Sequence, residues 1–196
     1  MFYVKYVRPG REKQRIDIGI TEDGESVKNY SLSLVFYSHI GEPCRNEKIS
    51  EMTLKYIADE DEQFRAMKKA LSLLSYSDKS RSALYSRLLS LGYSGASASE
   101  AVKECLRLGY IDEREQIIRF VKDEANRSLK GRLHIMKKAA SKGFKSDEVK
   151  KILNELCECG EVDFEANFER LAEKKGAYSE EERAALKYKN GYTGRY

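Results

Sequence analysis

The sequence predicts a mainly α-helical protein, in which tandem three-helix repeats form an elongated array behind a small N-terminal β-containing segment. The main observation is a period of 51 residues, since Gly92-Tyr93 recurs as Gly143-Phe144 (143 − 92 = 51). A second is that apolar residues of the later part recur at helical intervals of three and four, whereas residues 14–20 alternate as in a strand. Repeats that bury a face against their neighbours usually expose a long binding surface.

Composition limits the class of protein. The chain has 196 residues, 41% of them hydrophobic, which is enough for a core in one large or two small domains. A net charge of +4 is too small to identify nucleic acid as a partner. The four cysteines lack paired metal spacing, the N-terminus lacks a signal-peptide core, and no apolar run approaches the roughly 18 residues that span a bilayer. We therefore expect a cytoplasmic protein without a cofactor, a metal site or a membrane partner.

The first 45 residues read as a small β-hairpin segment. Asp23-Gly24 supplies a turn signal between the alternating residues 14–20 and a strand from Ser26 to Tyr30. Residues 32–37 could end the sheet or begin a short helix.

Two helices should follow the β segment. Asn46 or Ser50 could cap the first, which would run through Ile57. The acidic run 59–62 would begin the second, because negative charge favours a first helical turn.

The period then defines the repeats. Helix two of the first repeat contains Leu84, which recurs as Ile135, and Gly109 recurs as Gly160 at the end of helix three. The predicted division of the chain is a β segment at 1–45, a first repeat with its leading helix at 46–113, a second repeat at 114–163 and a partial third repeat at 164–196.

Turn residues support the three-helix unit. Gly92 and Gly143 can take the left-handed conformation that ends a helix. Residues 97–100 (Ser-Ala-Ser-Glu) read as a capping box for helix three of the first repeat, and Ser146 as the cap in the second.

The third repeat has a less regular register, because Gly191 falls only 48 residues after Gly143 (191 − 143 = 48). Either its second helix is shorter or the register is displaced. Arg183 and Leu186 stand one further period after Arg132 and Ile135.

The repeat resembles a known family at three short segments. These are Ser80-Arg81-Ser82-Ala83-Leu84, Leu91-Gly92-Tyr93-Ser94 and Leu108-Gly109-Tyr110-Ile111-Asp112. In this order, behind a helix at 64–74, they resemble the bacterial RecX regulatory proteins over roughly residues 46–190.

The resemblance implies a cytoplasmic, non-enzymatic protein that binds RecA recombinase filaments. It implies a role in recombination, DNA repair and the SOS response, in which the protein mostly inhibits strand exchange and co-protease activity by lying in the filament groove. It also implies single- or double-stranded DNA as a further partner for some members. We expect a monomer. The chain departs from the family pattern at Glu161, where the first repeat has Tyr110, and in its incomplete third repeat.

No constellation of residues favours an enzyme. The only histidines, His39 and His134, fall in different predicted domains, and no Ser/His/Asp or Cys/His arrangement is visible. Cys157 and Cys159 correspond to Leu106 and Leu108 one period earlier, which favours packing over redox chemistry. We therefore expect this chain to have no catalytic residues.

Basic residues form the candidate partner or DNA-binding surface. Residues 119–151 carry 11 basic and 4 acidic residues (11 − 4 = +7), whereas residues 152–183 carry 4 and 10 (4 − 10 = −6). Arg81 and Arg132 hold equivalent positions, and could meet repeated acceptors on a filament or only contact their own helices. The predicted binding residues are Arg81, Lys122, Arg127, Lys130, Arg132, Lys137, Lys138 and Lys142.

Two alternatives to this surface remain. The set could be an ordinary solvated helix face. The chain could also be a nucleic-acid-binding module that acts indirectly by competing for single-stranded DNA. Sequence-specific reading of a major groove is disfavoured, because the third helices expose carboxylates at their leading ends.

Overall fold

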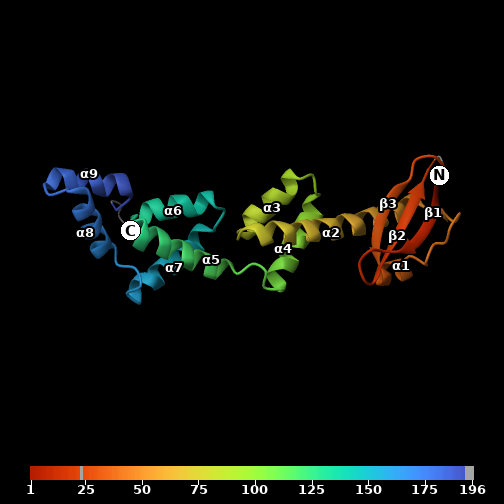
Figure 1. Ribbon diagram of the computed structural model, residues 1–196, viewed down its shortest axis with the longest axis horizontal. Helices are drawn as coiled ribbons and strands as arrows, with labels where there is room; N and C mark the ends of the chain where they lie inside the picture. The colour runs from red at the N-terminus through yellow and green to blue at the C-terminus, as the bar shows by residue number, and fades with distance from the viewer. Residues whose placement is uncertain (23, 193–196) are drawn as a thin grey trace. The chain divides into compact units, whose positions relative to one another are not determined.

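The computed structural model describes residues 1–22 and 24–192 as a mainly helical protein with an N-terminal four-stranded antiparallel sheet (Figure 1). This confirms the predicted class, a helical chain behind a β segment. The chain forms two compact units: Met1–Leu73 with Arg87–Cys105, and Leu74–Ser86 with the residues from Leu106 onward. Among the described helices, none combines the length and the apolar character needed to cross a membrane.

The sheet has the strand order β3-β2-β1-β4, and every pair is antiparallel. Its strands are β1 (Phe2–Pro9), β2 (Arg15–Thr21), β3 (Lys28–Ser33) and β4 (Lys48–Ile49). One face is apolar and packs with the first half of α2 (Glu51–Tyr76). The core there contains Val4, Ile18, Ile20, Leu32, Ile49 and Ile57.

The hairpin and its continuation agree in outline with the sequence. Gly24 has a φ of 86°, as the turn requires, while its partner Asp23 lies outside the described residues. The strand predicted from Ser26 begins two residues later, and α1 (Leu34–His39) follows it directly. Ser33 ends β3 and caps α1, because its hydroxyl accepts from the Phe36 nitrogen at 3.2 Å.

The expectation of two helices after the sheet was wrong, because α2 is continuous. It begins after Ser50, whose hydroxyl accepts from the Thr53 nitrogen at 3.0 Å. The acidic run lies inside the helix, and two of its members, Glu60 and Asp61, face the edge of the sheet. Asp61, only 3% exposed, accepts from the Ser31 nitrogen at 2.8 Å, so its charge satisfies a strand edge and not a helix start.

The 51-residue period fixes helix boundaries in the first two repeats. The second helices are α3 (Arg81–Ser90) and α6 (Arg132–Ser141), and the third helices are α4 (Gly95–Arg107) and α7 (Ser146–Glu158). Leu84 and Ile135 both stand at the fourth position of their helices, and both are fully buried. The repeated environments predicted for this pair are confirmed.

The first helix of the second repeat changes character near its end. It consists of α5 (Glu113–Lys122) and a π-helical turn, η1 (Asp123–Arg127), where a single helix was expected. Leu129 then takes a φ of 51°, in the left-handed region. The irregular segment redirects the chain toward α6.

The prediction that glycines end the second helices is confirmed, whereas the residues predicted to cap the third helices were wrong. Gly92 and Gly143 have φ values of 90° and 81°. However, α4 begins at Gly95, and Ser94 caps it by accepting from the Ser97 nitrogen at 3.2 Å. The equivalent of Ser94 in the second repeat is Lys145, which cannot cap, so Ser146 is the first helical residue.

The third repeat contains α8 (Phe164–Lys175) and α9 (Glu180–Asn190). With eleven residues against the ten of α6, α9 is not a shortened helix. It begins three residues before the position one period after Arg132 (132 + 51 = 183), so the displaced register was the correct alternative. Gly191, with a φ of 76°, ends α9 as Gly143 ends α6.

Successive repeats meet through equivalent positions within the second compact unit. The residue before α3, Ser80, donates from its hydroxyl to the Lys142 carbonyl at 2.8 Å, beside Gly143. The residue before α6, Gly131, donates from its backbone nitrogen to the Asn190 carbonyl at 2.8 Å. The start of each second helix therefore contacts the end of the next one.

Candidate partner-binding surface

Three predicted basic residues gather around His134 at the junction of η1 and α6. Burial lowers the pKa of His134 below its ordinary value, and the nearby charges of Lys130, Lys138 and Lys137 lower it further, while Glu124 opposes them. Lys137 and Lys138 lie on α6 as predicted, whereas Lys130, which was expected to point outward from the same helix, precedes it and is half-buried.

The helix positions explain which side chains project outward. Ile135 and Ala139 face the core of the second repeat, so Lys137 and Lys138, which are exposed, lie on the opposite side. Lys137 forms no ion pair with any described residue. It is available to an external acceptor.

Two of the clustered lysines also bind polar side chains of this chain. The Lys138 ammonium lies 2.6 Å from Glu124, a carboxylate that is 10% exposed. The Lys130 ammonium donates to the Asn190 side-chain oxygen at 2.9 Å. These contacts position the charges and leave Lys138, 44% exposed, able to act on a partner.

The two equivalent arginines face the next repeat. The Arg81 guanidinium lies 2.6 Å from both Glu113 and Glu148. Arg132 donates to Asn154 at 2.5 Å, and its guanidinium lies 5.7 Å from the centre of the Phe164 ring. Phe164 is the equivalent of Glu113 (113 + 51 = 164).

Burial raises the pKa of Glu113, and the charge and backbone nitrogen of Arg81 oppose that shift. A buried carboxylate that loses such a partner is costly, so Arg81 has a structural task at the joint between repeats. Its role toward an external partner stays a prediction.

The remaining predicted residues are spread over the second repeat. Lys122 pairs with Glu161, and this hydrogen bond raises the pKa of the Lys122 ammonium. Arg127 lies 3.0 Å from Asp123, one helical turn before it, and is 81% exposed. The Lys142 ammonium lies 5.8 Å from the centre of the Phe120 ring. Exposed pairs of this kind are weak, so a partner can compete for these cations.

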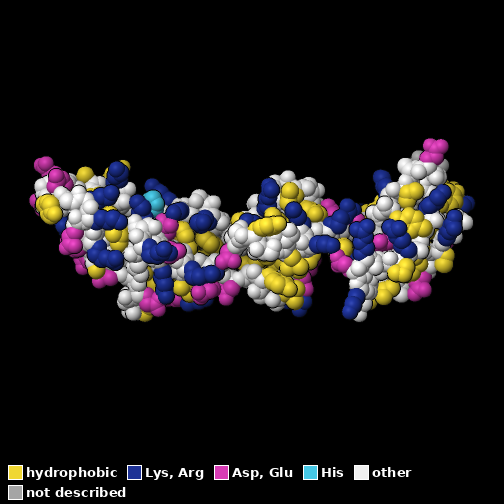
Figure 2. Space-filling view, in the orientation of Figure 1, with side chains coloured by type: hydrophobic (Ala, Val, Ile, Leu, Met, Phe, Trp, Pro, Cys, Tyr) yellow, Lys and Arg dark blue, Asp and Glu magenta, His cyan; other side chains and the backbone are white. Residues whose placement is uncertain are grey.

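Sequence reasoning did not include three groups that this geometry adds. His134 lies among the clustered lysines, and its place two residues after Arg132 on a basic helix was the available signal. Lys150 and Lys151 are exposed on α7, within the basic stretch 119–151. Figure 2 shows basic side chains interspersed with acidic ones over α5 to α9, so the surface is a mosaic and not a uniform patch.

The structure supports a packing role for Cys105 and Cys157, whereas Cys159, which was also expected to pack, is exposed, as is Cys44. Cys105 is buried, and burial raises the pKa of both the Cys105 and the Cys157 thiols. A raised pKa keeps the thiol protonated and less nucleophilic. No three His, Cys, Asp or Glu side chains among the described residues come together as a metal site would require.

Comparison with known proteins gives similarity of fold only. The chain is similar over 100% of its length to a structure described as regulatory protein RecX, with a TM-score of 0.70, 16% identity and 95% of that chain covered. RecX from Lactobacillus salivarius is similar over 69% of this chain and 90% of its own, with a TM-score of 0.56 and 22% identity. No family model matches the sequence, and no curated protein sequence is significantly similar to it.

Proposed function

We propose that this chain is a regulatory protein that binds RecA recombinase filaments and inhibits strand exchange and co-protease activity. The supporting observation is the similarity in fold to a RecX regulatory protein over the full chain, with a TM-score of 0.70. The sequence motifs of the repeats favour the same class independently. The partner and the direction of the effect follow from that resemblance, and not from a bound ligand.

The proposed mechanism is occlusion of the filament groove by the helical repeats. A filament presents the same acceptor many times, and several modest contacts to one filament act with a high effective concentration. Exposed cations on η1 and α6 suit such contacts, because electrostatic complementarity speeds association and fixes orientation. The catalytic machinery of an enzyme is not needed for this effect.

The test removes exposed charges without removing those that join the repeats. The variant carries Arg127→Gln, Lys137→Gln and Lys142→Gln, because these cations are exposed and have only weak internal partners or none among the described residues. We expect about tenfold more of this variant to be needed for half-inhibition of strand exchange, as three contacts of about 0.5 kcal/mol each would give.

The matched control removes the same number of charges elsewhere, with Lys55→Gln, Lys103→Gln and Lys175→Gln, all of which are exposed. It should inhibit as the unaltered protein does. Equal inhibition by both variants would remove η1 and α6 from the proposal.

A second experiment separates filament binding from competition for DNA. Preformed filaments are challenged with the protein in the presence of excess free single-stranded DNA. A filament binder still inhibits under these conditions. Loss of inhibition in proportion to the added DNA would favour the nucleic-acid-binding alternative.

A further inference from the structure

The N-terminal sheet has a second face, opposite its apolar core, that carries aromatic and basic side chains. Its register places Tyr3 opposite Thr21, Tyr6 opposite Gly19 and Arg8 opposite Asp17. Thr21, Gly19 and Asp17 alternate along β2, so they share one face, and their partners on β1 share it too. We call this face the outer face. Its members are Tyr3, Tyr6, Arg8, Asp17, Gly19, Thr21, Asn29 and Lys48.

A β-bulge creates this grouping. The pairing of β1 with β2 shifts between Val4 and Tyr6, which leaves Lys5 as the additional residue. In a regular strand, Tyr3 and Tyr6 would point to opposite faces of the sheet, because side chains alternate along a strand. The bulge therefore places two tyrosines on the outer face while Val4 and Val7 remain with the core.

Tyr6 lies flat on the sheet. A Cβ at Gly19 would overlap the Tyr6 ring, so the absence of a side chain at that position allows the ring to lie against β2. The Tyr6 hydroxyl donates to the Asn29 side chain on β3. The opposite side of the ring lies under the Arg8 guanidinium, which is exposed and can move aside for a planar group.

Each tyrosine of the outer face has a cation beside it. The Arg8 guanidinium lies 4.9 Å from the centre of the Tyr6 ring, and the Lys48 ammonium lies 5.9 Å from that of Tyr3. Arg8 is 63% exposed and only 3.8 Å from Asp17, a weak pair that a phosphate can displace. The β1–β2 hairpin, residues 2–21, carries five basic and two acidic residues (5 − 2 = +3).

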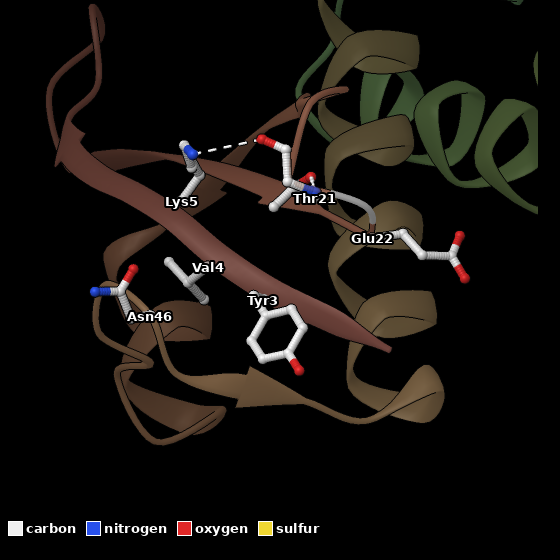
Figure 3. Close-up of a pocket in the computed structure, with 7 residues that line it drawn as sticks. Tyr3, Val4, Lys5, Thr21, Glu22 and Asn46 are labelled. Carbon is white, nitrogen blue, oxygen red and sulfur yellow. Dashed lines mark hydrogen bonds between the residues drawn. The ribbon is translucent and has the colours of Figure 1, made fainter.

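A cavity of about 400 Å³ adjoins Tyr3, as Figure 3 shows. Lys5 lines it and donates to the Gly24 carbonyl at 3.5 Å, which is the limit of a hydrogen bond. Asn46 also lines it, and its side-chain amide has no hydrogen-bond partner among the described residues. The Glu22 carboxylate lines the hollow as well, so an amide, an ammonium and a carboxylate together offer donors and acceptors to the polar edge of a nucleobase.

We propose that the outer face binds single-stranded nucleic acid, with bases stacked on Tyr3 and Tyr6 and phosphates held by Arg8 and Lys48. Aromatic rings interleaved with cations on a sheet recognise unpaired bases, because every base has a face that can stack and every linkage has a negative charge. A duplex hides its base faces and should bind less well. The proposal does not depend on the filament partner of the helical repeats. If both proposals hold, a Tyr3→Leu, Tyr6→Leu variant should inhibit preformed filaments even in excess single-stranded DNA, so the two are tested apart.

The experiment measures binding of the full chain to fluorescein-labelled dT20 by anisotropy at 50 mM and 200 mM salt. The test variant is Tyr3→Leu with Tyr6→Leu, which keeps apolar bulk and removes the rings. We expect at least a tenfold weaker affinity. The matched control is Tyr3→Phe with Tyr6→Phe, which keeps the rings and should stay within twofold of the unaltered protein.

Charge is tested separately with Arg8→Gln and Lys48→Gln. Each lost phosphate contact should reduce the slope of log affinity against log salt by about 0.7. The triple variant of Arg127, Lys137 and Lys142 should retain its affinity for dT20, which distinguishes the outer face from the helical surface.

A cross-linking experiment on the unaltered protein tests the same proposal without relying on variants that must fold. The unaltered protein is irradiated with an oligonucleotide that contains 5-iodouracil, and the modified peptides are identified by mass spectrometry. Cross-links at Tyr3 or Tyr6 are expected. Cross-links confined to residues 113–190, absence of binding at 50 mM salt, or unchanged affinity of the leucine variant would overturn the proposal.

Discussion

The backbone nitrogen of Gly131 donates a hydrogen bond to the carbonyl oxygen of Asn190 at 2.8 Å. A second bond, from the Leu133 nitrogen to the Gly191 carbonyl at 3.0 Å, lies beside it. The two backbones approach so closely that a Cβ on Gly131 would overlap the carbonyl carbon of Gly191. The second and third repeats are therefore joined by a contact that only glycine permits.

This contact predicts that Gly131→Ala destabilises the protein by about 3 kcal/mol, because the new methyl group must force the backbones apart. Gly160→Ala is the control: its φ is 75°, and nothing lies within 4 Å of the added atom, so it should cost only the left-handed strain, about 1 kcal/mol. Urea denaturation followed by circular dichroism measures both. Equal losses would show that crowding at the joint is unimportant.

The joint between the first and second repeats should depend on Arg81. Replacing it by Ala leaves Glu113, which is 9% exposed, as an unpaired buried carboxylate, and we expect a loss of about 3 kcal/mol. Adding Glu113→Gln to the Arg81→Ala variant should restore part of the lost stability, because the amide carries no buried charge. A double-mutant cycle on unfolding free energies would give a coupling above about 1 kcal/mol, and strictly additive losses would contradict the pairing.

Glu62 should make the first compact unit sensitive to acid. Burial raises its pKa, but hydrogen bonds from Ser94 and Ser97 outweigh burial and leave the pKa below its ordinary value of 4.5. A carboxylate with a depressed pKa stabilises the fold above its unfolded pKa, and that stability is lost as the pH falls through the folded value.

Glu62→Gln should therefore cost about 1.5 kcal/mol at pH 7, and the difference from the unaltered protein should shrink below pH 4.5. Asp59→Asn, an exposed position on the same helix, should show no such convergence. Urea titrations at several pH values test both variants. A constant difference at all pH values would exclude the proposed hydrogen bonds as its source.

Binding of an acidic partner at the proposed surface should be linked to proton uptake by His134. Lys130, Lys137 and Lys138 help to lower its pKa in the free protein, and Glu124 opposes them. Negative charge from a partner would raise that pKa, so affinity should increase as the pH falls from 7.5 to 6. His134→Gln should reduce this dependence. An unchanged pH profile in that variant would place the partner elsewhere.

Much of the helical architecture could be predicted, because the repeat supplies an internal comparison. Leu84 and Ile135 share their burial, and Gly92 and Gly143 share their left-handed backbone. The errors came from tertiary partners that local sequence cannot name. Ser94 caps α4 with the help of Glu62, 32 residues earlier, and Asp61 serves the edge of β3.

The candidate site was less predictable than the fold. Spacing within α6 correctly placed Lys137 and Lys138 outward, because one helix determines its own faces. Spacing could not show that Arg81 and Arg132 point toward the next repeat, since their partners come from helices that the chain reaches later. The predicted domain boundaries and the role of each basic residue stay predictions.

Because the first two repeats are offset by a constant 51 residues, one whole period could be removed from the chain with its helix boundaries kept in register. Excising residues 113–163, a segment of one full period, would connect Asp112 directly to Phe164, and the aspartate that caps α5 would then cap α8. The guanidinium of Arg81 would meet an aromatic ring in place of a carboxylate, the same exchange that Arg132 already accepts. Shortened versions of the gene could arise by unequal crossing-over, but Ser80 would then take the place of Gly131 beside Gly191, so this joint would have to repack.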